Sequence, residues 1–99
     1  MKAVVSADAP GAEDVSVAEL PDPVPGPGEV LVRVSYCGVN YPDVLLLQDR
    51  YQLRPQRPFT PGGEVGGEVI ATGEGVAGFE PGDRVMARMS LGGMAELVT

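Results

Sequence analysis

Glycine and proline interrupt this chain so often that no long helix fits between them. The 99 residues include 14 glycines and 10 prolines, which separate short apolar runs and form no repeat. The clearest of these runs is Glu29–Val39, whose alternation is typical of a β-strand. It assigns one face to Val30, Val32, Val34 and Tyr36 and the other to Leu31, Arg33, Ser35 and Cys37. We therefore expect a β domain made of short strands.

The pattern of apolar runs and turn residues predicts six strands. They are expected at Lys2–Ser6, Val15–Leu20, Glu29–Val39, Glu64–Thr72, Arg84–Arg88 and Met94–Val98. The first two flank a turn signal and should pair as a hairpin, and the third should be the central strand. The prediction is a mainly β fold, a partly open β-barrel with one short helix, that forms a single domain over residues 1–99.

The one helix is expected immediately after the central strand. Asn40 suits an N-cap, Pro42 suits the first turn, and Asp43 complements the helix dipole. The apolar run Val44–Leu47 should then pack against the barrel. Residues 21–28 hold four prolines and should form an extended surface connection, whereas residues 50–61 hold three and are expected to form a loop that folds over a pocket.

Charge and residue usage exclude several classes of function. Lys and Arg number 7 against 14 Asp and Glu, so the net charge of -7 repels nucleic acid. The longest apolar run is too short to cross a membrane, and the N-terminus lacks a basic region followed by an apolar one, so we expect a cytoplasmic protein. The single cysteine, Cys37, cannot form an intramolecular disulfide, and the chain has no histidine to act as metal ligand or general base.

One motif resembles a dinucleotide-binding loop by its spacing alone. Residues 73–78, GEGVAG, match G-x-G-x-x-G and follow an expected strand. That motif works by opening a helix whose N-terminus receives the pyrophosphate, and Pro81-Gly82 follows too soon for a helix to form. Glu74 and Glu80 would also repel a phosphate. We interpret the segment as a turn between strands.

A longer pattern covers Pro61–Val85. Its glycines have the spacing of the zinc alcohol dehydrogenase signature of the medium-chain dehydrogenase/reductase superfamily, with Gly63 in the place of the histidine. Upstream, residues 37–43 resemble the segment that ends with a metal-ligating cysteine in zinc members, and Asn40 holds that place. Pro42 and Leu45 stand where zinc enzymes tend to place a proton relay, and residues 89–92 leave no room for a structural zinc lobe. The resemblance therefore argues against zinc-dependent alcohol oxidation.

The remaining features are similar to the zinc-free quinone oxidoreductase branch of that superfamily. The similarity is carried by Val39–Gln48, Tyr51-Gln52 and Pro58–Gly62, and it spans Met1–Thr99. It implies an N-terminal GroES-like domain, with Thr99 lying before the Rossmann domain that binds NADPH. The implied reaction is hydride transfer from NADPH to an electron-poor quinone or enone. The 99-residue chain alone is expected to be inactive.

The resemblance also implies site residues, each with a competing structural role. Asn40 is expected near the nicotinamide, where its amide donates to a carbonyl or a ribose hydroxyl, or it caps the helix. Tyr41 covers the cofactor or belongs to the core. Tyr51 lines the acceptor pocket and protonates the reduced product, or anchors its loop. Glu64 faces the cleft, or bonds to backbone or an arginine.

Two further expectations concern the loop arginines and the thiol. Arg50, Arg54 and Arg57 either meet a 2′-phosphate or an acyl-CoA acceptor, or lie in solvent. Cys37 is expected to be buried and inert, since no neighbour in sequence would lower its pKa.

An alternative from another class is a free-standing GroES-like binding module or co-chaperonin, which needs a mobile loop with an apolar anchor and a ring-forming interface. Phe59 in the loop of residues 50–61 offers an anchor, but the loop fits the oxidoreductase pattern better. Because the family's barrel is completed by a segment from the far end of the chain, the fragment is also expected to expose a strand edge and to pair with itself.

Overall fold

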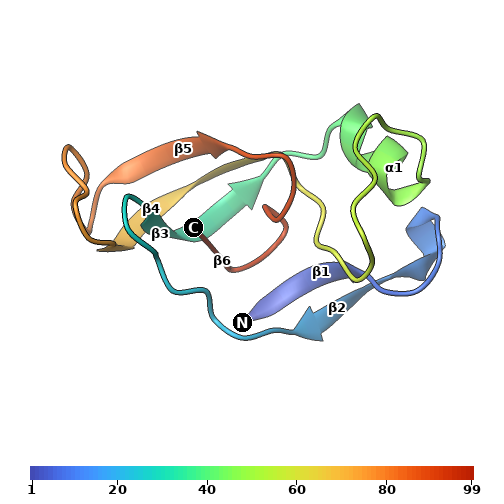
Figure 1. Cartoon of the computed structure of the whole chain (residues 1–99), viewed down its shortest axis with the longest axis horizontal. Helices are drawn as coiled ribbons and strands as arrows, with labels where there is room; N and C mark the ends of the chain where they lie inside the picture. Colours follow the sequence, from blue (N-terminus) through green and yellow to red (C-terminus); the bar gives the residue numbers. More distant parts are fainter.

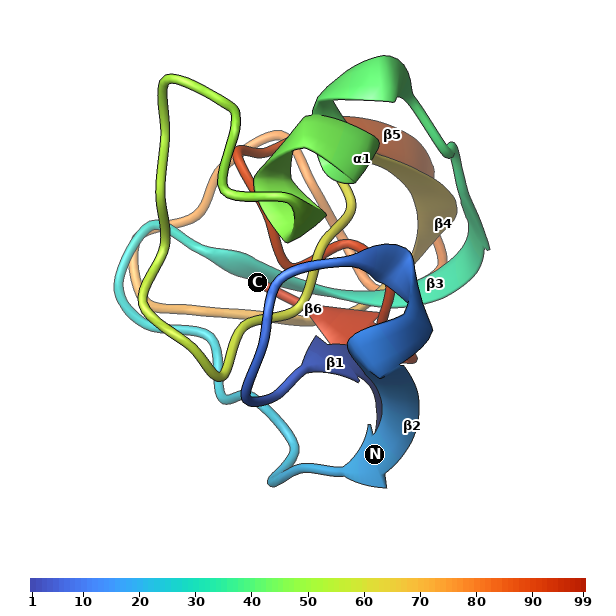
Figure 2. The same ribbon diagram turned by 90° about the vertical axis from the view of Figure 1, so that its right-hand side faces the viewer.

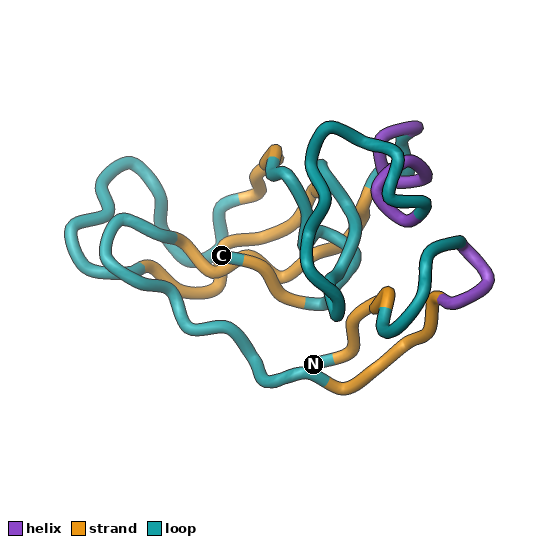
Figure 3. Tube along the Cα trace, turned by 45° about the vertical axis from the view of Figure 1, so that its right-hand side comes forward, coloured by secondary structure: helices purple, strands orange, loops and turns teal.

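The computed structural model describes all residues from Met1 to Thr99 and is mainly β with one α-helix, as predicted. Its elements are β1 (Lys2–Ser6), a 3-10 turn η1 (Ala12–Asp14), β2 (Val15–Glu19), β3 (Val30–Cys37), α1 (Tyr41–Leu47), β4 (Glu64–Thr72), β5 (Arg84–Arg88) and β6 (Leu97–Val98). Figure 3 shows how much of the chain lies in the loops between them. None of its helices is long and apolar enough to cross a membrane.

The strands form two antiparallel sheets that face each other as a partly open barrel. β1 and β2 make a two-stranded sheet, which confirms the predicted hairpin, and the other sheet has the order β5-β4-β3-β6 (Figure 1). β3 therefore lies inside its sheet, as expected. Figure 2 shows the β1–β2 hairpin below the larger sheet and α1 at the end of the barrel.

Two irregular segments connect the sheets through β1. Ser6 and Phe59 exchange backbone hydrogen bonds of 2.9 and 3.1 Å, and the Val4 N–H donates to the Met94 carbonyl at 2.8 Å. The strand predicted at Met94–Val98 is shorter than expected, because residues 94–96 bond to β1 around an isolated bridge and only Leu97–Val98 is paired with β3 as a strand. β1 is thus bonded on both sides.

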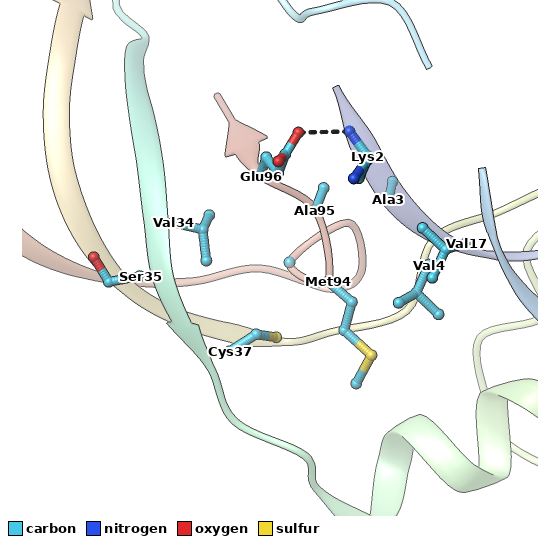
Figure 4. A pocket seen from close by; sticks show the side chains of 11 residues that line it. Lys2, Ala3, Val4, Val17, Val34, Ser35, Cys37, Met94, Ala95 and Glu96 are labelled. Carbon is cyan, nitrogen blue, oxygen red and sulfur yellow. Dashed lines mark hydrogen bonds between the residues drawn. The ribbon is translucent and has the colours of Figure 1, made fainter. Parts of the chain in front are cut away.

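The core lies between the sheets. Val32, Val65, Val69 and Val98 form its buried centre, and Leu46 of α1 is buried outside this cluster. Beside this centre the sheets leave an apolar seam of about 320 Å³, lined by side chains such as Val4, Val34 and Met94 (Figure 4). The Lys2 N–H closes one end of the seam by donating to a Glu96 carboxylate oxygen at 2.6 Å.

The alternation predicted for Glu29–Val39 is wrong at its C-terminal end. The register between β3 and β4 shifts between Val34 and Tyr36, which is the signature of a bulge. The extra residue exchanges the two faces, so Tyr36 is 80% exposed whereas Cys37 packs against the core. The predicted placement of Tyr36 on the same face as Val32 and Val34 is therefore incorrect.

Residues 73–78 form a turn between β4 and β5, as predicted, and no helix follows them. Gly75 and Gly78 have φ values of 78° and 86°, which favour glycine. Gly73 donates its N–H to the Glu29 carbonyl at 2.7 Å, and a Cβ at this position would overlap the Gly26 carbonyl oxygen. The glycines of this motif serve backbone packing.

Candidate functional site

A cavity of about 670 Å³ opens at the end of the barrel where α1 lies. Four segments build it: the start of α1, the loop after α1, the first residues of β4, and the end of β5 with the residues that follow. Its lining residues are Asn40, Pro42, Asp43, Leu46, Tyr51, Gln52, Leu53, Gly63, Glu64, Arg88, Met89 and Ser90. Three predicted site residues, Asn40, Tyr51 and Glu64, are thus brought together from distant parts of the sequence.

Asn40 is the N-cap residue of α1 and also a wall of the cavity. Its backbone is extended, with φ −123° and ψ 162°, and its carbonyl accepts the Asp43 N–H at 3.0 Å. Asn40 and Asp43 form a capping box, in which the Asn40 N–H donates to the Asp43 carboxylate at 2.8 Å. The side-chain NH₂ group of Asn40 donates to no atom of the chain, so it remains available to a ligand.

Asp43 is the buried acid of the site, with only 4% of its surface exposed. One carboxylate oxygen accepts the Asn40 N–H at 2.8 Å, and the other accepts the Gly62 N–H at 3.0 Å. A buried carboxylate needs such donors because its desolvation is otherwise costly. Asp43 thereby fixes the start of α1 against the segment that leads into β4.

Gly63 lines the cavity, and Gly62 precedes it in the segment that leads into β4. Gly62 has φ 109°, and a Cβ there would lie 2.6 Å from the Met94 nitrogen and 2.8 Å from the Cys37 sulfur. Only glycine fits this position without a shift of the backbone. Gly63 contributes no side chain to the cavity, so its wall is open backbone where the zinc pattern has a histidine.

Glu64 and Arg88 face each other across the β4–β5 pair, and both line the cavity. They are paired in register, yet neither takes part in an ion pair of the chain. The Glu64 side chain instead lies against Gly38, where an added Cβ would overlap it. Glu64 therefore does not pair with an arginine, and that alternative is wrong.

Arg57 holds the loop that carries Tyr51. Its guanidinium donates to both Asp49 carboxylate oxygens at 2.9 and 3.0 Å, to the Leu47 carbonyl at 2.9 Å, and through Nε to the Ser6 hydroxyl at 3.0 Å. The Arg57 side chain is only 14% exposed. It therefore ties the loop to the end of α1 and to β1, and neither the phosphate-binding nor the solvated interpretation describes it.

Tyr41 lies outside the cavity and is 73% exposed, so its alternative role in the core is wrong.

Cys37 is half-buried, and burial, followed by the nearby Asp43 charge, raises the pKa of its thiol. The thiol therefore stays protonated near neutral pH, as expected for an inert cysteine.

Sequence reasoning missed Asp43, Arg88 and Ser90 as cavity residues. Asp43 appeared only as a dipole partner, and its acid character at the start of a helix was the one local signal. Arg88 and Ser90 reach the cavity through the pairing of β4 with β5, which no local pattern reveals. No three His, Cys, Asp or Glu side chains of the chain lie close enough together to hold a metal ion.

Two sheets that form a partly open barrel, with a helix-walled cavity at one end, are the architecture of a GroES-like domain. The chain belongs to the family described as the alcohol dehydrogenase GroES-like domain, whose model matches residues 26–99. This domain family is part of the medium-chain dehydrogenase/reductase superfamily. The relatives of the chain include quinone oxidoreductase-like proteins and VAT-1 homologs.

Among curated relatives, quinone oxidoreductase-like protein 2 of Bos taurus is 49% identical over 70 residues, which cover 71% of this chain and 20% of the relative. The human synaptic vesicle membrane protein VAT-1 homolog-like protein has a TM-score of 0.95 at 39% identity, covering 99% of this chain and 32% of that one. A mycobacterial protein whose structure was solved with NADPH has a TM-score of 0.86 at 32% identity, and the match covers 98% of this chain and 30% of that one. The chain thus spans a fifth to a third of the length of these relatives.

Proposed function

We propose that this chain is the acceptor-binding part of a zinc-independent, NADPH-dependent oxidoreductase that reduces an electron-poor quinone or enone. The observation that carries the proposal is the composition of one cavity wall. Asn40 and Gly63, which stand at the two positions where the zinc pattern has its cysteine and histidine, line the same cavity. An amide and a bare backbone replace two metal ligands there, and a carbonyl compound can approach both.

The lining suits the nicotinamide end of a cofactor and a flat acceptor. A free amide donor, an open glycine wall and the apolar Leu46 and Met89 can accommodate a planar ring. When bound, NADPH supplies the hydride. The phosphates find no glycine-rich helix N-terminus on this chain, so we propose that a Rossmann domain of a longer polypeptide binds them and that residues 1–99 alone are inactive.

Each predicted residue then has a defined task. The Asn40 amide donates to the acceptor carbonyl or to a ribose hydroxyl and orients it. Tyr51 provides the proton that the reduced acceptor needs, and Glu64 lines the acceptor pocket at its rim. Tyr41, exposed beside Asn40, covers a cofactor that arrives from outside the domain.

A chimera tests the proposal. Residues 1–99 replace the corresponding segment of the mycobacterial relative solved with NADPH, and oxidation of NADPH by a benzoquinone is followed by absorbance. We expect quinone-dependent turnover that withstands dialysis against a metal chelator. The replacement Asn40→Ala should lower turnover by about a hundredfold to a thousandfold, as expected for loss of one positioned donor. A folded chimera that binds NADPH without reducing any quinone would contradict the proposal.

The family match favours this oxidoreductase over the co-chaperonin alternative. The cytoplasmic location expected from composition remains a prediction.

A further inference from the structure

A second hollow adjoins the cavity on the outer face of the larger sheet. It has a volume of about 350 Å³ and centres on Tyr36, Gly66 and Met86. Glu64 and Arg88 line both this hollow and the cavity, so the two spaces adjoin across the ridge that these side chains form.

The strand register gives the hollow its shape. Gly66 of β4 is paired with Tyr36 of β3 and with Met86 of β5, so the three residues form one row across the sheet. Adjacent strands lie about 5 Å apart, which separates the Tyr36 and Met86 backbones by about 10 Å. A Cβ added at Gly66 would meet no atom within 4 Å. The result is a trough with a backbone floor and two apolar walls, wide enough for a single alkyl chain.

The two side chains that form the walls are largely exposed to solvent. Met86 is 89% exposed, and Tyr36 is exposed because the β3 bulge turns it outward. A single exposed apolar side chain needs no explanation, but two that flank an open glycine form a surface that gains from being covered.

Charged pairs limit what can cover it. Glu64 and Arg88 are opposite each other at one end of the trough, and Glu68 and Arg84 are opposite each other at the other end. The apolar strip between them is narrow, whereas a stable protein interface buries about 800 Å² on each partner. A slender substituent of a small molecule fits this strip better than a protein surface does.

We infer that the trough binds an alkyl substituent of the quinone acceptor whose ring occupies the adjoining cavity. The inference rests on the proposed function. It adds a preference for quinones that carry a side chain, with the chain leaving the cavity over the Glu64–Arg88 ridge.

The test compares two quinones by NMR titration of the 99-residue chain. The first is a dimethoxy-dimethyl-benzoquinone, and the second is its homologue with one ring methyl replaced by a pentyl chain. Both rings are fully substituted and therefore offer no unsubstituted carbon for addition of the Cys37 thiol, which is kept protonated. We expect the ring to shift signals of Asn40 and Gly63 in both cases, and the pentyl chain to shift Tyr36, Gly66 and Met86. Binding of the pentyl quinone should be at least about tenfold tighter, the effect of burying two methylene groups.

Variants of the trough and of a neighbouring surface separate the outcomes. Gly66→Val fills the trough with a residue that strands favour and should abolish the preference for the pentyl quinone. Met86→Thr removes one wall and should reduce that preference severalfold, while Thr72→Val, on the same strand as Gly66 but outside the trough, should keep it.

Ring shifts in the cavity with an unchanged preference in Gly66→Val would overturn the inference and support the proposed function. Shifts in the trough without ring shifts in the cavity would contradict the proposed function. Signals of Tyr36 and Met86 that move with protein concentration alone would assign the trough to a second copy of the chain and also overturn the inference.

Discussion

The carboxylate of Asp43 should contribute a large part of the stability of the cavity wall. It is buried and accepts two backbone N–H groups, from Asn40 at 2.8 Å and from Gly62 at 3.0 Å. Hydrogen bonds to a charged group contribute about 1.5–3 kcal/mol each, and a buried donor left without a partner costs a similar amount. Asp43→Ala removes both acceptors and should lower the free energy of unfolding by about 3–5 kcal/mol.

Asp43→Asn is the sharper variant because it keeps the shape of the side chain. One oxygen remains to accept a single N–H, while the new NH₂ group faces the other donor, so the expected loss is about 2–3 kcal/mol. The free energy of unfolding of a small domain is only about 5–15 kcal/mol in total. The alanine variant could therefore unfold, whereas the asparagine variant should stay folded, so that its stability can be measured.

The assay is urea unfolding followed by circular dichroism, together with amide hydrogen exchange. The control is Asp8→Asn, an exposed aspartate near the surface turn, which should change stability by less than about 0.5 kcal/mol. Exchange should accelerate at the Asn40 and Gly62 amides in particular. If Asp43→Asn loses no more stability than the control and both amides stay protected, the two hydrogen bonds of Asp43 do not stabilise the cavity wall.

Three further predictions concern the backbone, pH and assembly. Gly62→Ala should lower the free energy of unfolding by about 2–4 kcal/mol, because Gly62 has a positive φ and no space for a Cβ. Gly66→Ala should leave the stability nearly unchanged, because a Cβ there meets no atom. Equal thermal stabilities of the two variants would contradict this prediction. N–H donors from Ala9, and next from Asp8, lower the pKa of Asp14, so its contribution to stability is present above the ordinary value of 3.8 and is lost as the pH falls through the lowered value. Asp14→Asn should remove that acid-dependent loss in unfolding curves measured against pH, and an unchanged acid profile would argue against the assignment. We also propose that the chain self-associates through a strand edge, since β2 and β5 each pair on one side only; gel filtration that gives a monomer at every concentration would exclude it.

The strands that the sequence predicts best are those in which a local pattern decides. Glu64–Thr72 and Arg84–Arg88 have the predicted limits because glycine turns bound the first on both sides and Pro81-Gly82 precedes the second. The N-cap at Asn40 is likewise set by residues within one turn of it. Where neighbours in sequence determine the conformation, the prediction holds.

The features that escaped prediction depend on partners far along the chain. The bulge in β3 that exposes Tyr36 arises from pairing with β4, and no residue near Tyr36 in the sequence indicates the bulge. The burial of Asp43 depends on Gly62, 19 positions away. Arg88 enters the cavity through its register with Glu64. Strand register is a property of two segments at once, so single-strand periodicity cannot supply it.

The partners already made inside the cavity determine which of its groups are free for chemistry. Asp43 uses one oxygen for each of two backbone donors, and the Cys37 thiol, which lines the apolar seam rather than the cavity, is kept protonated by burial and by the Asp43 charge. The Asn40 amide and the Glu64 carboxylate remain at the surface of the cavity without such bonds. A site with these groups can orient a carbonyl compound and exclude water, but its protein groups provide no strong nucleophile. This division suits a reaction in which a bound cofactor supplies the reactivity and the domain supplies the position.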